Sequence, residues 1–264
     1  MVSWYGFVLA APPPALVALY AQTTVFQLCG PAFLPSVALK TALLAAVALL
    51  LPPLARRCHP AFAALDRKTQ LGAAGWASAL IHHAAVCALS LAALRAEFAH
   101  GRVDLAGLTG GVSWSCAYLL CDTLVTAVPN ALEGSYDYLL HHLLGIAVTC
   151  LTLAAPASVL RLAPHVWLCE LSAFGLGVSW ACLKLGWSSS ALCAGAELFF
   201  LLAFVATRIL NLPVVVYAAQ LHGSIGPAVQ AAMWAIVALQ FYWLNGIVKK
   251  GLGKYGGGKA AKQV

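Results

Sequence analysis

The chain has 264 residues, of which 62% are hydrophobic and only 9% are charged, and its formal net charge is +7. Soluble domains carry roughly 25% charged residues, so these residues cannot cover a water-exposed surface, and a soluble globular protein is excluded. The mean hydropathy of +0.88 predicts an integral membrane protein instead. The Lys and Arg residues flank apolar segments and form no basic face, which argues against a nucleic-acid partner.

The apolar segments suffice for about seven or eight crossings of a bilayer, because one spanning helix needs about 20 residues. We predict spans over residues 4–28, 36–54, 71–95, 111–129, 138–155, 165–183, 190–217 and 227–248. Pro12-Pro13-Pro14 predicts a kink or break in the first span, and Pro52-Pro53 bounds the second. The sixth span is short and carries Glu170, so a half-span is the alternative there. Pro213 predicts a kink near the end of the seventh.

Basic residues predict the orientation of the chain. They gather in the loop 56–68 and in the tail 249–262, and six predicted spans separate the two. Both basic segments therefore lie on the same side, which the positive-inside rule assigns to the cytosol. Arg102 and Arg161 fall on the opposite side. We expect a cytosolic C-terminus with a flexible basic tail over 251–264.

Ionisable side chains within apolar spans are costly unless they are paired or face a wet cavity, so each is a candidate site residue. The candidates are His82, His83, Asp122, His141, His142, Glu170, Glu197 and Arg208. Asp137 and His141 are four residues apart and share a helix face, so the carboxylate could orient the imidazole. The pair His141-His142 then suits a general base or nucleophile near the cytosolic surface, with a structural hydrogen-bonding role as the alternative.

Asp122 is expected to form a polar pocket with His141 or His142, because the loop between their spans is short. Tyr118 lies one turn before Asp122 on the same face. The alternative is a hydrogen bond that packs two helices. His82 and its neighbour His83 could add to the same pocket.

Glu170 and Arg208 predict an intramembrane ion pair, with Glu197 as a competing partner for the arginine. The histidines could also ligate a metal. However, membrane di-iron hydroxylases need several histidine clusters spaced three or four residues apart, and this sequence has none. We therefore predict no metal and no bound cofactor.

The polar residues stand in an order that resembles the TLC-domain family, whose members include ceramide synthases, translocon-associated proteins, an ER cargo receptor and proteins of membrane-lipid homeostasis. The resemblance rests on Ser78-x-x-x-His82, Tyr118-x-x-x-Asp122, Asp137-x-x-x-His141-His142, Glu170-x-Ser172 and Phe204-x-x-x-Arg208 followed by Pro213. It implies an all-α polytopic transmembrane bundle, with a six-helix TLC core around an internal cavity and one or two N-terminal spans. The expected division is N-terminal transmembrane segments over 1–55 and a TLC domain over 67–250.

The resemblance also implies what the site does. In ceramide synthases a double histidine is required for acyl transfer from acyl-CoA to a sphingoid amine, and His141 and His142 correspond to it, with Asp122 orienting the imidazole. The active pattern continues with paired aspartates, whereas residues 164–170 here contain no Asp. This departure favours the small lipid-homeostasis members, in which His82, Tyr118, Glu170 and Arg208 would line a lipid cavity.

Three functions follow as hypotheses. The first is a lipid-binding protein of membrane-lipid homeostasis, whose partner is a membrane lipid or fatty acyl chain. The second is a ceramide-synthase-type N-acyltransferase, with acyl-CoA as co-substrate. The third is an ER transporter or cargo receptor. Residence in the endoplasmic reticulum is implied by the resemblance, and the sequence leaves a homo-oligomer open.

Overall fold

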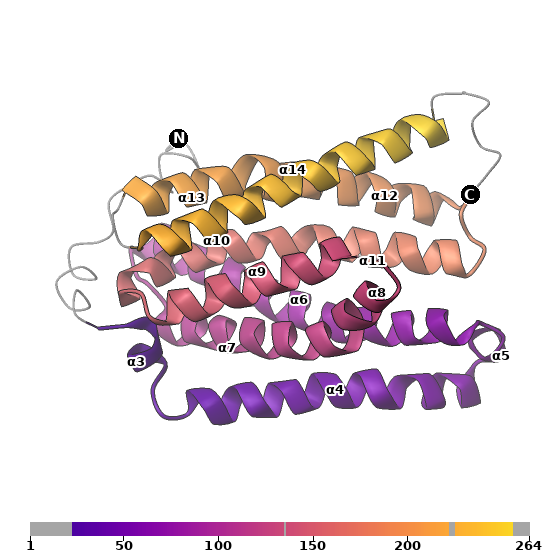
Figure 1. The fold of residues 1–264 in the computed structure, drawn as a ribbon, viewed down its shortest axis with the longest axis horizontal. Helices are drawn as coiled ribbons and strands as arrows, with labels where there is room; N and C mark the ends of the chain where they lie inside the picture. The colour runs from indigo at the N-terminus through magenta and orange to yellow at the C-terminus, as the bar shows by residue number, and fades with distance from the viewer. Residues whose placement is uncertain (1–22, 135, 222–224, 256–264) are drawn as a thin grey trace.

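A computed structural model describes residues 23–134, 136–221 and 225–255, and within these ranges the chain is helical and contains no strand (Figure 1). This confirms the predicted all-α class. The helices are α3 (Val25–Cys29), α4 (Phe33–Cys58), α5 (Pro60–Ala63), α6 (Arg67–His100), α7 (Leu105–Asp122), η1 (Thr123–Ala127), α8 (Val128–Leu132), α9 (Tyr136–Leu153), η2 (Ala157–Leu162), α10 (Ala163–Trp167), η3 (Leu168–Glu170), α11 (Leu171–Lys184), α12 (Ala191–Phe204), η4 (Val205–Asn211), α13 (Leu212–Leu221) and α14 (Pro227–Tyr255).

Six helical segments of the described chain are long and apolar enough to cross a membrane. They are α4, α6, the run α7–α8, the run η2–α11, the run α12–α13, and α14. The 18 residues of α9 run alongside them, but Asp137, His141 and His142 in its first two turns lower its hydropathy. The predicted first span, 4–28, falls almost entirely outside the described residues.

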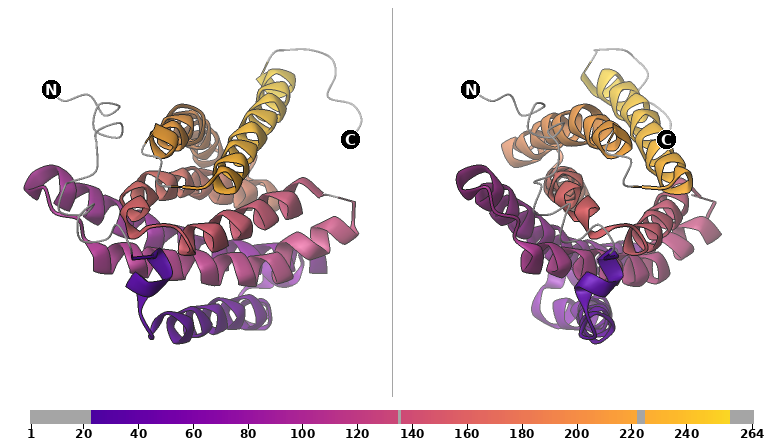
Figure 2. Two further views of the ribbon diagram at one scale, coloured as in Figure 1. Left: turned by 60° about the vertical axis from the view of Figure 1, so that its left-hand side comes forward. Right: turned by 90° about the vertical axis from the view of Figure 1, so that its left-hand side faces the viewer.

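The helices from α6 onward form a closed ring. Along this ring α6 packs on α7, α7 on α9, α9 on α14, and α14 on α13, while α11 contacts both α12 and α6 and so closes the circle (Figure 2). Helix α4 lies outside the ring against α6 and α7 (Figure 1). The best spanning window of α4 is only 17% buried, against 50% in α6, so most of the surface of α4 is left to face lipid. The arrangement matches the predicted six-helix core with an additional N-terminal helix.

The predicted end of the second span is wrong, and the alternative of a half-span at the sixth is not borne out. Helix α4 continues through Pro52-Pro53 to Cys58. Pro52 is buried and lies close to the end of the helix, so packing against the bundle offsets the hydrogen bonds that the two prolines cannot donate. The sixth span is not a half-span, because residues 157–184 form one helical run of 28 residues. Short 3₁₀ turns at η2 and η3 keep that run continuous.

Two turns in the ring are π-helical, and each ends two residues before a proline. η1 precedes Pro129 and η4 precedes Pro213, so the kink predicted at Pro213 takes the form of a widened turn. A proline lacks the N–H group and clashes with the carbonyl four residues earlier, which here lies within the π segment. π turns often occur at functional sites. Here Asp122 directly precedes η1, and Arg208 lies within η4.

Candidate functional site

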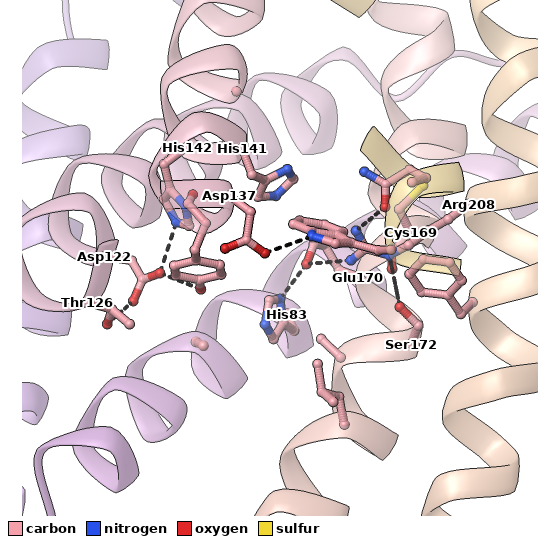
Figure 3. A pocket seen from close by; sticks show the side chains of 18 of the residues that line it. His83, Asp122, Thr126, Asp137, His141, His142, Cys169, Glu170, Ser172 and Arg208 are labelled. Carbon is pink, nitrogen blue, oxygen red and sulfur yellow. Dashed lines mark hydrogen bonds and ion pairs between the residues drawn. The ribbon is translucent and has the colours of Figure 1, made fainter. Parts of the chain in front are cut away.

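The ring encloses a cavity of about 2260 Å³. Binding sites for small molecules typically measure roughly 300–1,000 Å³, so this cavity has room for a much longer ligand. Its wall is largely apolar, and its apolar lining includes Val112, Val148, Val159, Leu160, Leu212, Val216, Met233 and Ile236. Two clusters of polar side chains interrupt this wall, and Figure 3 shows them on opposite sides of His141 and Asp137.

The first cluster, the Asp122 centre, is built around a carboxylate that is only 3% exposed. Its Oδ2 accepts hydrogen bonds from the hydroxyls of Tyr118 at 3.2 Å and Tyr138 at 2.8 Å, and its Oδ1 accepts one from Thr126 at 2.6 Å. Nε2 of His142 lies 2.9 Å from the same Oδ2. Four neighbours therefore stabilise a charge that would otherwise be costly inside the bundle.

Local helix geometry explains how this centre assembles. Tyr118, Asp122 and Thr126 follow one another at four-residue intervals on α7 and η1, so they share one face. Tyr138 and His142 have the same spacing on α9, where Nδ1 of His142 lies 3.1 Å from the carbonyl oxygen of Tyr138. Contact between α7 and α9 then brings the two faces together. Asp122, Tyr118 and His142 thus meet, as the pocket hypothesis requires.

The contacts of His141 differ from those that its four-residue spacing from Asp137 predicted. The proposed pairing of His141 with Asp137 is wrong, because Asp137 accepts a hydrogen bond from Nε1 of Trp243 on α14 at 3.1 Å. The indole ring of Trp243 also packs on the imidazole of His141, with ring centroids 5.0 Å apart. Nδ1 of His141 has no hydrogen-bond partner within the described ranges, although it is buried. His141 therefore presents an unpaired nitrogen next to the cavity.

The second cluster, the Glu170 centre, joins α6 to η3 and η4. Oε2 of Glu170 lies 2.7 Å from Nδ1 of His83 and 3.8 Å from Nη2 of Arg208. The predicted pair with Arg208 is thus present but long, and His83 is the closer partner. Nε of Arg208 shares its single N–H between the carbonyl oxygen of Cys169 at 3.0 Å and the hydroxyl oxygen of Ser172 at 2.9 Å, which holds the guanidinium beside η3 and α11.

Tyr118 links the two centres. Its ring stacks on His82 with centroids 4.2 Å apart and planes 9° apart, while its hydroxyl donates to Asp122. The ring centroid of His142 lies 6.0 Å from that of Tyr118. All seven residues predicted for the site therefore line one cavity, and they divide between two neighbouring centres.

Several polar contacts were not predicted from the sequence. Tyr138, Thr126 and Trp243 became site residues only through contacts between helices or across a π turn. The side-chain oxygen of Gln240 accepts a hydrogen bond from Nη1 of Arg208 at 3.2 Å. A polar amide within an apolar span could have marked this residue from the sequence. Lys40 on α4 is likewise a charged residue within an apolar span. In the structure it contacts Ser113, and its Nζ lies 5.2 Å from the ring centroid of Trp114.

The far end of the bundle holds a buried ion pair that bears on the topology. Nε of Arg161 bonds to Oε1 of Glu97, and both side chains are less than a tenth exposed. Arg161 had counted against the predicted orientation as a basic loop residue. The structure places Arg161 in a buried helical turn, paired with Glu97, and not in an exposed loop.

The sequence pattern of the TLC domain matches residues 79–249, which is more than half of the chain. The chain belongs to the TLC-domain family. No curated protein and no solved structure matches it significantly. The matched part of this TLC-domain protein runs from α6 to α14 and contains every residue of both centres, whereas α4 lies before it.

This arrangement offers specific chemistry. Each centre pairs an imidazole with a carboxylate, which is the grouping that orients a histidine for proton transfer. The unpaired nitrogen of His141 lies beside the first pair and can accept a proton or an electrophilic group. The apolar remainder of the cavity suits an alkyl chain.

Proposed function

We propose that this TLC-domain protein binds a membrane lipid inside its helix ring and acts in membrane-lipid homeostasis. The carrying observation is the cavity of about 2260 Å³, whose largely apolar wall is interrupted by the two polar centres and, at one end, by basic side chains. An acyl chain would lie along the apolar wall, and a polar head would reach the unpaired His141 and the Glu170 carboxylate. A lipid bound in this way buries its acyl chain against the apolar wall and pairs its polar head with the polar side chains.

We further infer that the protein lies in the membrane of the endoplasmic reticulum and that the end of the ring beside α5 faces the cytosol. Basic residues from distant parts of the chain gather where the cavity reaches this end: Arg67, Lys68, Lys184, Lys249 and Lys250. This distribution supports a cytosolic assignment by the positive-inside rule. The start of α9, with both histidines, then lies toward the cytosolic leaflet (Figure 1).

Filling the cavity tests lipid binding. Val148 lines the cavity from α9, so Val148→Trp is expected to displace the bound chain and to lower copurified lipid several-fold. Lipids extracted from the detergent-purified protein would be quantified by mass spectrometry. The matched control is Leu143→Trp, because Leu143 lies on the same helix but is 51% exposed on the outside. Equal lipid content in both variants would contradict a ligand inside the ring.

A second candidate function is N-acyl transfer from acyl-CoA to a sphingoid base. It is favoured by the contact between His142 and Asp122 at 2.9 Å beside the unpaired His141, since this geometry suits activation of an amine. Microsomes that contain the protein should then form N-acyl sphingoid base, and His142→Ala should abolish it, with a loss of at least about 100-fold. A product level equal to that of empty-vector microsomes would leave lipid binding as the function.

A further inference from the structure

We propose that His82, His83 and Glu170 form a binding site for a divalent transition-metal ion of the zinc class. One ligand atom from each residue lies within 4.8 Å of the others. Two imidazoles and one carboxylate form a recurrent ligand set of catalytic zinc and non-haem iron sites. This site goes beyond lipid binding. The spacing of residues along the chain did not predict it, because two ligands come from α6 and the third from η3.

The distance between the two imidazoles fits a metal. Zn–N bonds of about 2.1 Å in a tetrahedron place neighbouring ligand nitrogens about 3.4 Å apart. Nδ1 of His82 lies 3.4 Å from Nδ1 of His83. Oε2 of Glu170 lies 2.7 Å from Nδ1 of His83, so the carboxylate would move outward by about 0.7 Å, which a rotation of the glutamate side chain supplies.

The hydrogen bonding of His82 supports the same conclusion. If Nδ1 of His83 donates its proton to Glu170, no proton remains between His83 and His82, and two nitrogen lone pairs or two N–H groups cannot satisfy each other. A cation that accepts the lone pairs of both Nδ1 atoms removes the conflict.

The surroundings hold the three ligands in place. The ring of Tyr118 stacks on His82 at 4.2 Å and fixes the plane of that imidazole. Nη2 of Arg208 approaches Oε2 of Glu170 only to 3.8 Å, beyond hydrogen-bond distance, so this oxygen remains able to bind another ligand. All three ligands line the cavity, so a remaining coordination position would be open to the cavity contents, as in catalytic metal sites.

Metal content of the full-length protein tests this site. Detergent-purified protein, stripped with a chelator and reloaded with Zn²⁺, should retain one zinc per chain after gel filtration, measured by mass spectrometry of the metal. Removing even an outer partner of a zinc ligand weakens affinity about 10–100-fold, so His82→Asn and Glu170→Gln should each lower affinity at least about 10-fold. His100→Asn, the same substitution at an exposed histidine at the end of α6, should keep the full zinc content.

Two further measurements separate the site from misfolding and from adventitious binding. Zn²⁺ should raise the Tm of the wild type and of His100→Asn, but should leave the Tm of Glu170→Gln at its metal-free value. Co²⁺ should give the intense visible absorption of a four-coordinate site only when His82 is present. Zinc content or cobalt absorption that does not differ between the wild type and the His82→Asn and Glu170→Gln variants would overturn the proposal. That outcome would leave the proposed lipid binding intact.

Discussion

Replacing Asp122 with alanine is expected to lower the free energy of unfolding by about 3–5 kcal/mol, because the substitution removes one partner from a buried charged network. The carboxylate is 3% exposed and accepts from Tyr118, Tyr138 and Thr126. Without it, three hydroxyls lose their acceptor inside the bundle, and the imidazole of His142 loses the carboxylate that lies 2.9 Å from its Nε2. Denaturant unfolding in detergent micelles, followed by circular dichroism, measures the loss.

The matched control is Asp104→Ala, because it is the same substitution in the same helical segment. Asp104 caps the N-terminus of α7, where Oδ1 accepts from the backbone N–H of Gly107 at 3.0 Å. Losing such a cap costs about 1 kcal/mol. The variant Asp122→Asn keeps one acceptor oxygen, so its stability should fall between those of the two alanine variants. If both alanine variants lost the same free energy, the Asp122 centre would not be a coupled network.

Substitution of Gly175 with alanine is expected to lower the free energy of unfolding by about 1–3 kcal/mol through overpacking. A Cβ atom at this position would lie 2.7 Å from both the carbonyl oxygen of Ala196 and the backbone nitrogen of Phe200. These are backbone atoms of α12, so no side-chain rotation relieves the clash, and α11 and α12 must separate. Separation of these helices would also distort the ring near Glu170, so bound lipid should fall together with stability.

Gly195→Ala supplies the control for Gly175. Gly195 lies on α12 and has nothing within 4 Å of the position that a Cβ would take. Alanine is favoured over glycine in a helix by up to about 1 kcal/mol, so this variant should be as stable as the wild type or more so. Thermal unfolding of both variants in the same detergent decides the comparison. A stable Gly175→Ala protein would show that α11 and α12 do not approach as closely as described.

The sequence by itself determined the class of the protein and the local arrangement of its polar groups. A charged fraction of 9% excluded a soluble domain, and apolar segments of about 20 residues indicated membrane-spanning helices. Helical periodicity placed Tyr118 and Asp122 on one face, and they are hydrogen-bonded as that spacing predicts. The order of the polar residues along successive spans indicated the family, and the match over residues 79–249 bears this out.

Only the tertiary structure decided which polar groups meet. The spacing predicted that Asp137 would orient His141, whereas Asp137 bonds to Trp243 and His142 pairs with Asp122. Likewise no spacing along the chain predicted that His83 would contact Glu170. Periodicity fixes the face on which a side chain lies. In lipid, however, the outside of a bundle is as apolar as its packed interior, so hydrophobicity does not say which helix that face meets. Close packing of the ring, together with the widened turns before Pro129 and Pro213, determines which helices contact each other.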